Sequence, residues 1–192
     1  MITFTIVDSP IGRLYLRANG CALTGLYMEV PGREFPHDPS WVEDAEAAPL
    51  AAAARQLEEY FSGARHAFDL PLAFEGTPFQ QRVWRVLTEI PYGETVSYGE
   101  LARRVENPRA SRAVGMANNR NPISILVPCH RVIGKDGSLT GYGGGLWRKR
   151  LLLELERTGR LPGRDENSED REGEKTGRQA AQTAPAVEVS TQ

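Results

Sequence analysis

The stretch Thr-Pro-Phe-Gln at residues 77–80 constrains the fold more than any other part of this 192-residue chain. Threonine is a preferred N-cap and proline suits the first helical position. Gln80 follows Thr77 by three residues, as a capping box requires. Apolar residues then recur with helical spacing as far as Ile90. A helix is therefore expected to begin here, and it divides the chain into two units.

The first unit, residues 1–76, is predicted to be a small α+β domain. Its first 30 residues alternate in polarity like β-strands, with breaks at Ser9-Pro10 and Asn19-Gly20. A proline-rich loop follows, and then a helix with Pro49 in its first turn and Gly63 beyond its end. The expected apolar face of that helix consists of Leu50, Ala53, Ala54, Leu57 and Phe61.

The second unit, residues 77–162, is predicted to be mainly helical. Ser97 and Glu100 have the spacing of a second capping box, and Asn107 with a proline behind it is the expected cap of the next helix. Two helices joined by a short link indicate a helix-turn-helix, although a helical hairpin within a core has the same signature. The last helix is expected to end at Gly159.

Charge is distributed unevenly along the chain. Residues 1–76 carry a net charge of −6, residues 77–160 carry +7, and residues 161–192 carry −3. A basic middle segment is suited to a phosphate backbone, and solvated arginine-rich helices give the same pattern. Residues 163–192 contain few large apolar residues and are expected to form a disordered tail.

Composition is typical of a soluble globular protein, with 40% hydrophobic residues. No apolar run is long enough for a membrane span, and the N-terminus lacks the features of a signal peptide. A cytoplasmic protein is therefore expected. The two cysteines, Cys21 and Cys129, favour free thiols over a disulfide in a reducing compartment. Neither cysteines nor histidines show metal-site spacing, so no metal and no cofactor are expected.

Cys129 and His130 stand side by side in the stretch VPCHRVIG. A thiol is a weak nucleophile unless a base or a positive charge lies beside it, and His130 is a candidate base. Adjacent residues on an extended segment point in opposite directions, so the pair needs a tight turn or a bridging water. A carboxylate must then orient the imidazole, and helical periodicity does not choose between Glu154 and Glu156. A structural cysteine is the alternative.

Four stretches together resemble the methylated-DNA–protein-cysteine methyltransferases, which are O6-alkylguanine-DNA alkyltransferases. They are SYGELA, NPRASRAVG, NPISILVPCHRVIG and GYGGGLWRKRLLLELE. The likeness spans roughly residues 77–160, and PCHRVIG is its most specific part. The first unit fits the family's ribonuclease-H-like domain by pattern alone. The resemblance implies DNA repair by direct damage reversal, in which a single-turnover transferase acts without a cofactor.

The resemblance also implies a role for individual residues. Cys129 would accept the alkyl group, His130 would deprotonate the thiol through a water, and Glu156 would orient His130. Asn121 would brace the turn that carries the thiol. Tyr98 would press on a phosphate and help to protonate the leaving guanine. Main-chain groups and one aromatic ring would line the base pocket, at Cys129, Val132, Tyr142 and Gly143.

Double-stranded DNA containing alkylated bases is the partner that the resemblance implies. The helix-turn-helix would lie against the minor groove, and Arg112 would enter the duplex and fill the gap left by the extruded base. Such extrusion is needed because a methyl group on a stacked base cannot be reached by an in-line nucleophile. The expected DNA-contacting residues are Ala110, Ser111, Arg112, Ala117 and Asn118. A monomer is expected, with O4-methylthymine as a second candidate substrate and cooperative binding on DNA left open.

Three other functions compete with this interpretation. A papain-type hydrolase would need a different signature around its cysteine. A DNA-binding regulator would need only the helix-turn-helix and would tolerate loss of Cys129. A non-reactive damage-binding relative would lack the cysteine, which is present here. No cysteine-rich N-terminal module of a methylation-responsive activator occurs either, so self-contained repair is the function that we expect.

Overall fold

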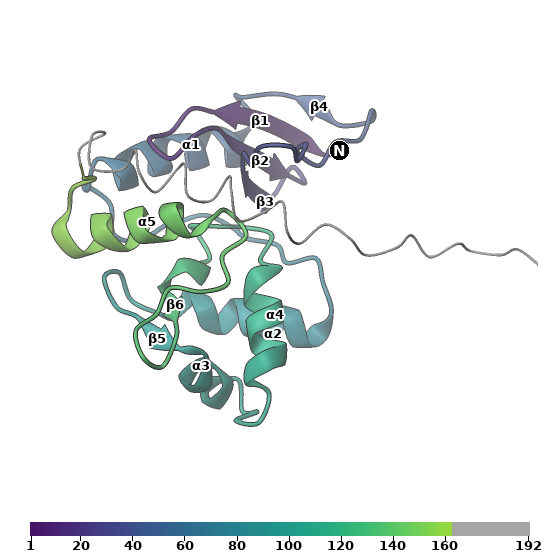
Figure 1. Ribbon diagram of the computed structural model, residues 1–192. Coiled ribbons are helices and arrows are strands. Elements are labelled where there is room, and N and C mark those ends of the chain that lie inside the picture. The colour runs from purple at the N-terminus through teal and green to yellow at the C-terminus, as the bar shows by residue number, and fades with distance from the viewer. Residues whose placement is uncertain (163–192) are drawn as a thin grey trace, which may run out of the picture. The chain divides into compact units, whose positions relative to one another are not determined.

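The computed structural model describes residues 1–162 (Figure 1). The N-terminal part of the chain forms a four-stranded mixed sheet. The strand order is β3-β2-β1-β4, with β4 parallel to β1 and the other neighbours antiparallel. Tight turns close at Ser9, whose carbonyl accepts from the Gly12 amide, and at Asn19, whose amide donates to the Ala22 carbonyl. The two expected strand breaks are confirmed. The strands are β1 Thr3–Val7, β2 Leu14–Ala18, β3 Leu23–Met28 and β4 Val42–Glu43.

Helix α1, Ala48–Phe61, packs against β1 and β2 and begins with a proline in its first turn, as expected. Three of the predicted apolar positions, Leu50, Ala53 and Leu57, are buried. Ala54 and Phe61 are only half-buried, and Tyr60 is fully buried in their place. The buried face of α1 is therefore rotated toward Tyr60 relative to the prediction.

The rest of the described chain is mainly helical, with one short parallel pair of strands. Thr77 accepts from the Gln80 amide and the Gln80 side chain accepts from the Thr77 amide, so the capping box is confirmed. Gly159 ends the last helix in a left-handed conformation, also as expected. The elements are α2 Pro78–Thr88, β5 Val96–Ser97, α3 Tyr98–Arg104, α4 Ser111–Asn119, the 3-10 turn η1 Cys129–Arg131, β6 Val132–Ile133 and α5 Leu146–Thr158.

Two predicted helix starts need correction. Ser97 caps α3 by accepting from the Glu100 amide, but the Glu100 carboxylate binds Arg103 and Arg104 and does not return to Ser97. The capping box is therefore only half formed. The cap at Asn107 was wrong: this residue closes a turn with the Ala110 amide, and α4 begins at Ser111 without a side-chain cap.

Helices α3 and α4 pack against each other and against α2, the arrangement of a helix-turn-helix (Figure 1). The expected α+β architecture, a sheet-and-helix unit followed by a mainly helical unit, is confirmed. No helix within residues 1–162 is both long and apolar enough to cross a bilayer. The predicted tail, 163–192, lies outside the described residues.

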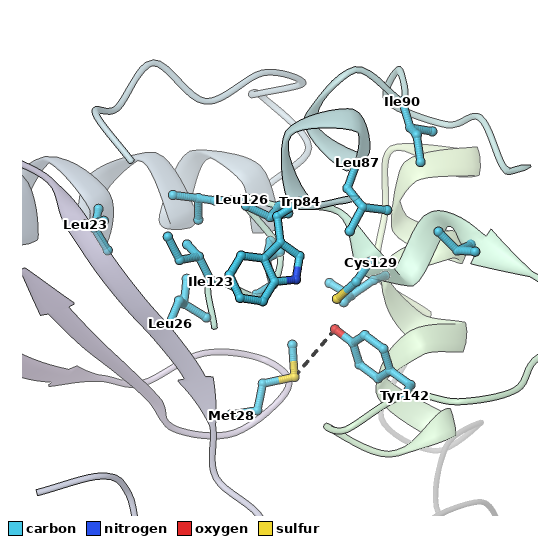
Figure 2. Packing of buried hydrophobic residues seen from close by; sticks show 14 of the residues in the cluster. Leu23, Leu26, Met28, Trp84, Leu87, Ile90, Ile123, Leu126, Cys129 and Tyr142 are labelled. Atoms are coloured by element: carbon cyan, nitrogen blue, oxygen red, sulfur yellow. Dashed lines mark hydrogen bonds between the residues drawn. The ribbon is translucent and has the colours of Figure 1, made fainter. Parts of the chain in front are cut away.

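A hydrophobic core joins the sheet to the helices. Trp84 of α2 is buried between Leu26 and Ile123 on one side and Cys129 on the other (Figure 2). Its indole N–H donates to the Ala117 carbonyl at 2.9 Å, which satisfies the polar end of a large apolar side chain. The segment that carries Cys129 is thus packed on both units.

Helices α1 and α5 meet closely at their C-terminal ends. Gly63 follows α1 with φ +78°, and a Cβ atom placed there would lie 2.2 Å from the carbonyl oxygen of Gly159. A side chain at position 63 would therefore need both an unfavourable backbone conformation and a displaced backbone. Gly159 has a similar φ of +71°, but a Cβ atom there would meet nothing within 4 Å.

This difference makes a matched pair of variants. We expect Gly63→Ala to lower the free energy of unfolding by roughly 2 kcal/mol or more, because steric overlap adds to the ~1–3 kcal/mol cost of a left-handed non-glycine residue. Gly159→Ala should lose only the part of the unfolding free energy that comes from the left-handed backbone conformation, because its added Cβ atom meets no other atom. Urea denaturation of both variants measures the difference. Equal losses would show that the contact between the two helix ends relaxes without cost.

Candidate active site

Cys129 lies in a tight 3-10 turn, η1, directly after Pro128. Its side chain is 4% exposed, and its amide donates to the Val127 carbonyl at 2.8 Å. The chain at Cys129–His130 is thus a turn, without the strict alternation of an extended segment. Cys21, by contrast, is exposed in the turn between β2 and β3, and both thiols are free.

Asn121 holds the segment that leads to the thiol. Its side-chain oxygen accepts from the Ile123 amide at 3.0 Å, and its amide nitrogen donates to the Val127 carbonyl at 2.8 Å. Between these contacts Ile125 has φ +72°, a conformation that β-branched residues avoid. Such strain persists only where surrounding contacts fix it. Asn121 therefore hydrogen-bonds to two points of the segment before the thiol, and its role in alkyl transfer stays a prediction.

His130 is fully buried, and its Nε2 lies 2.8 Å from Oε1 of Glu156. A carboxylate can only accept, so Nε2 carries the proton and Nδ1 is left with a free lone pair. Nδ1 is buried without a hydrogen-bond partner among the described residues. Of the two candidate carboxylates, Glu156 contacts the imidazole, whereas Glu154 pairs with Arg157 on the surface.

The Glu156 carboxylate binds further donors. Arg131 donates from Nε to Oε2 at 2.8 Å and from Nη2 to Oε1 at 3.0 Å. Burial alone would raise the pKa of Glu156, but the hydrogen bonds and charges of His130 and Arg131 reverse this and hold the pKa well below its usual range. Burial lowers the pKa of His130 more than Glu156 raises it, so the imidazole is neutral and can accept a proton.

The thiol itself is protonated at rest. Burial raises the pKa of Cys129, and the nearby Asn121 side chain and the Lys149 charge offset this only in part. Lys149 is also fully buried, and its Nζ donates to the carbonyls of Val132 and Thr140 at 2.6 and 2.7 Å. Burial lowers the pKa of Lys149 to about 8, and Cys129 acts in the opposite direction. A base is therefore needed to form the thiolate.

A cavity of about 360 Å³ opens onto Cys129. Tyr142, whose hydroxyl lies 3.8 Å from the sulfur of Met28, forms part of its wall (Figure 2). Gly143 is also in the wall, and a Cβ atom there would make only ordinary contacts with Asn119. The loop at residues 30–36 of the first unit completes the lining. Among the described residues, no three metal-ligating side chains converge on a potential metal site.

The remaining predicted pocket residues, Val132 and Tyr98, are not among the residues that line this cavity. Val132 is fully buried in β6, and its carbonyl is bound by Lys149. Tyr98, the first residue of α3, is half-buried and donates to the Thr140 carbonyl at 3.1 Å. Burial raises the pKa of Tyr98, as does the neighbouring Cys129. The Tyr98 hydroxyl is therefore protonated, and in this structure its proton is donated to Thr140.

Helix α4 presents only part of the predicted DNA-contacting set to solvent. Arg112 is exposed, and Ala110 and Ser111 at the helix start are partly exposed. Ala117 is 3% exposed and Asn118 is 1% exposed. These two predicted contacts need correction, because both side chains belong to the buried face of α4. The Asn118 amide instead reaches the Cys129 carbonyl at 3.4 Å.

Comparison with known proteins identifies the chain. Residues 78–158 match the family model of the 6-O-methylguanine DNA methyltransferase DNA-binding domain, and residues 2–74 match that of its ribonuclease-like domain. A methylated-DNA–protein-cysteine methyltransferase of Mycobacterium tuberculosis is 53% identical over 161 residues, which cover 82% of this chain and 94% of the relative. The chain belongs to the 6-O-methylguanine DNA methyltransferase family.

Other members of this methyltransferase family extend the likeness. A relative from Methanosarcina acetivorans with the same name is 52% identical over 153 residues, covering 80% of this chain and 97% of the relative. Among solved structures, M. tuberculosis OGT in complex with DNA has a TM-score of 0.77 and 49% identity. That comparison covers 86% of this chain and 98% of the OGT chain. The match therefore includes both units of the methyltransferase fold.

The structure adds three polar residues to the methyltransferase site that sequence reasoning missed. Arg131 and Lys149 were counted only as part of a basic segment, yet both are buried beside His130 and Cys129. Tyr60 of α1 donates from its hydroxyl to Oε1 of Glu156 at 2.8 Å. The sequence signal for the two cations was their position in or beside the motifs that carry the catalytic candidates, whereas Tyr60 had no such signal.

Proposed function

We propose that this protein repairs DNA by transferring the alkyl group of O6-alkylguanine to the sulfur of Cys129. The thiolate attacks the alkyl carbon, a carbon–sulfur bond forms, and the bond between that carbon and guanine O6 breaks. The guanine takes up one proton as it leaves. The thioether has no route back, so each molecule reacts once. The buried Cys129 thiol beside a neutral imidazole is the observation that carries this proposal.

His130 takes the proton from the thiol through its Nδ1 lone pair, with a water as the bridge. Two observations support this role. Nε2 is hydrogen-bonded to Glu156, and Nδ1 is buried without a hydrogen-bond partner among residues 1–162. Glu156 fixes the tautomer and stabilises the imidazolium that forms. Lys149 favours the thiolate electrostatically once it has formed. Tyr98 has a protonated hydroxyl and is the proposed proton donor to the leaving guanine, for which it must give up its hydrogen bond to the Thr140 carbonyl.

The cavity at Cys129 receives the extruded base. The ring of Tyr142 forms one wall, and the glycines that follow it let the backbone approach a flat ligand closely. Main-chain groups of Val132 and Gly143 complete the proposed contacts. Because the thiol is almost fully buried, a base that remained stacked in the duplex could not reach it. Base extrusion is therefore part of the proposed mechanism, and a monomer is the proposed functional unit.

DNA is the macromolecular partner, and α4 is its proposed docking element. Arg112 is the wedge that takes the place of the extruded base, and Ala110 and Ser111 bring the start of the helix to the backbone. Met116, one turn further along, is 59% exposed and adds an apolar contact to the same surface. In place of contacting DNA, Ala117 and Asn118 hold α4 against Trp84 and Cys129.

Loss of Arg112 tests the docking proposal. We expect Arg112→Ala to slow methyl transfer from a damaged duplex by roughly tenfold or more, since an inserted side chain offsets an unstacking cost of a few kcal/mol. Arg103→Ala is the control, because this exposed arginine on α3 is bound to Glu100. It should weaken binding to damaged and undamaged DNA equally. Identical behaviour of the two variants would leave Arg112 as one phosphate contact among several.

The function is tested by the intact mass of the protein after mixing with a duplex that contains one O6-methylguanine. Peptide mapping locates the added group, and digestion of the DNA measures restored guanine. One methyl group per protein on Cys129, matched by one restored guanine, is the expected result. An unchanged protein mass with the duplex still bound would replace this proposal by damage sensing or regulation through the helix-turn-helix.

A further inference from the structure

Helix α1 of the first unit contributes directly to the proton relay. The Tyr60 hydroxyl lies 2.8 Å from Oε1 of Glu156, the same oxygen that binds Nε2 of His130. Both the Tyr60 side chain and the Glu156 carboxylate are fully buried. We propose that Tyr60 is a positioning residue for alkyl transfer, whose hydroxyl holds Glu156 in place and limits how strongly this carboxylate binds His130. The inference rests on the proposed function.

The number of donors around Glu156 supports this role. Five hydrogen bonds reach the carboxylate: three at Oε1, from Tyr60, His130 and Arg131, and two at Oε2, from Arg131 and the Gly93 amide. A carboxylate offers about four lone-pair positions. The donors at Oε1 therefore compete, and each weakens the hold of the others on that oxygen. Removing one of them strengthens the remaining hydrogen bonds.

The Tyr60 ring is held rigidly enough to act this way. It packs against the rings of Phe61 and Phe68 with centroid distances of 5.4 Å, and against Tyr92 at 6.1 Å. Burial and the neighbouring Glu156 carboxylate raise the pKa of Tyr60 well above its ordinary value. The hydroxyl thus remains a donor at every pH at which the relay works.

The direction of the effect follows from the charges. Without the Tyr60 hydroxyl, the charge on Glu156 is shared among fewer donors and attracts the imidazolium form of His130 more strongly. The pKa of His130 then rises, and a larger fraction of the base is already protonated at acidic pH. The other titratable or charged groups that face this cluster are unchanged by the substitution: Cys129, Arg131, Tyr92, Tyr142 and Lys149.

The experiment measures the single-turnover rate of methyl transfer from an O6-methylguanine duplex across a range of pH for the full chain, Tyr60→Phe and Tyr92→Phe. Tyr92→Phe is the matched control, because its hydroxyl donates to the Leu155 carbonyl at 3.3 Å and not to Glu156. We expect the acidic limb of the Tyr60→Phe profile to move up by about half a pH unit, the scale of one lost hydrogen bond. On that limb the rate falls about threefold, whereas the alkaline plateau changes little.

The outcomes separate this inference from the proposed function. Absence of transfer by the unmodified chain would contradict the proposed function itself. If the unmodified chain transfers the methyl group, an unshifted Tyr60→Phe profile would overturn the positioning role. An equal shift in Tyr92→Phe would also overturn it, because the effect would then come from the aromatic cluster in general. Thermal denaturation of both variants verifies that they are folded at each pH.

Discussion

Replacement of Cys129 by serine should abolish alkyl transfer. The rate is expected to fall by at least about a thousandfold, because a serine hydroxyl ionises far less readily than a thiol and its oxygen is the weaker nucleophile. Serine is close to cysteine in size, so the packing against Trp84 and Tyr142 should survive. Intact mass after incubation with a methylated duplex gives the readout, and the protein mass should remain unchanged.

Cys21→Ser is the control for this experiment. Cys21 lies exposed in a turn and is not among the residues that line the cavity, so its loss should leave both the rate and the stoichiometry unchanged. DNA binding should persist in Cys129→Ser, since Arg112 and the exposed face of α4 are unchanged. Methyl transfer that survives in Cys129→Ser, or a methyl group mapped to Cys21, would assign the acceptor to another residue.

The second large effect is expected from Glu156→Gln. This change removes the anion between two buried partners and leaves the Arg131 guanidinium without its counter-charge. Breaking a buried ion pair in this way costs about 3–5 kcal/mol of stability. The transfer rate should also fall by about a hundredfold or more, the contribution of a general base that has lost its orientation. Urea denaturation and single-turnover kinetics measure the two effects separately.

Glu154→Gln provides the matched control two residues away on α5. Glu154 pairs with Arg157 at the surface, and exposed pairs contribute only about 0–1 kcal/mol. Neither stability nor transfer should change appreciably. If the two glutamine variants behaved alike, Glu156 would have no special role in the relay.

The pH dependence of stability provides a second test of Glu156. A carboxyl whose folded pKa lies below its unfolded value stabilises the protein above that unfolded value, near 4.5, and this contribution is lost as pH falls toward the folded pKa. His130 also has a lowered pKa, so acid begins to destabilise the fold below about 6.5. Glu156→Gln should remove the carboxyl's part of the acid sensitivity, below 4.5. The part that begins near 6.5 should persist and grow, because loss of Glu156 lowers the pKa of His130 further.

Local signals predicted the framework of the fold because they depend on neighbouring residues. The capping box at Thr77 and the terminal glycine at position 159 are satisfied within one helical turn. The false cap at Asn107 had the right residue types, but its carbonyl closes a turn with Ala110 instead. Ala117 and Asn118 were misplaced for a related reason: they lie three and four residues after the buried Val114, so they share its inward face.

Tertiary contacts account for what the sequence could not predict at the site. Helical periodicity did not choose between Glu154 and Glu156, and only the family resemblance pointed to Glu156. In the structure, the way α5 packs against η1 brings Glu156 to the imidazole. Tyr60 reaches the relay from 96 residues away in the chain, and no local pattern distinguishes its hydroxyl from that of a core tyrosine. Arg131 and Lys149 appear as ordinary surface cations in the sequence, although the structure buries both.

The burial of a neutral Cys129 thiol has a consequence for how long the protein remains usable. A molecule that reacts once is wasted if an oxidant or a stray electrophile consumes its sulfur first. Both reactions proceed through the exposed thiolate. With its pKa raised by burial and its side chain almost inaccessible, Cys129 should resist oxidation to sulfenic acid, whereas the exposed Cys21 lacks this protection. The same burial that requires a flipped base thus keeps the thiol intact until it meets alkylated DNA.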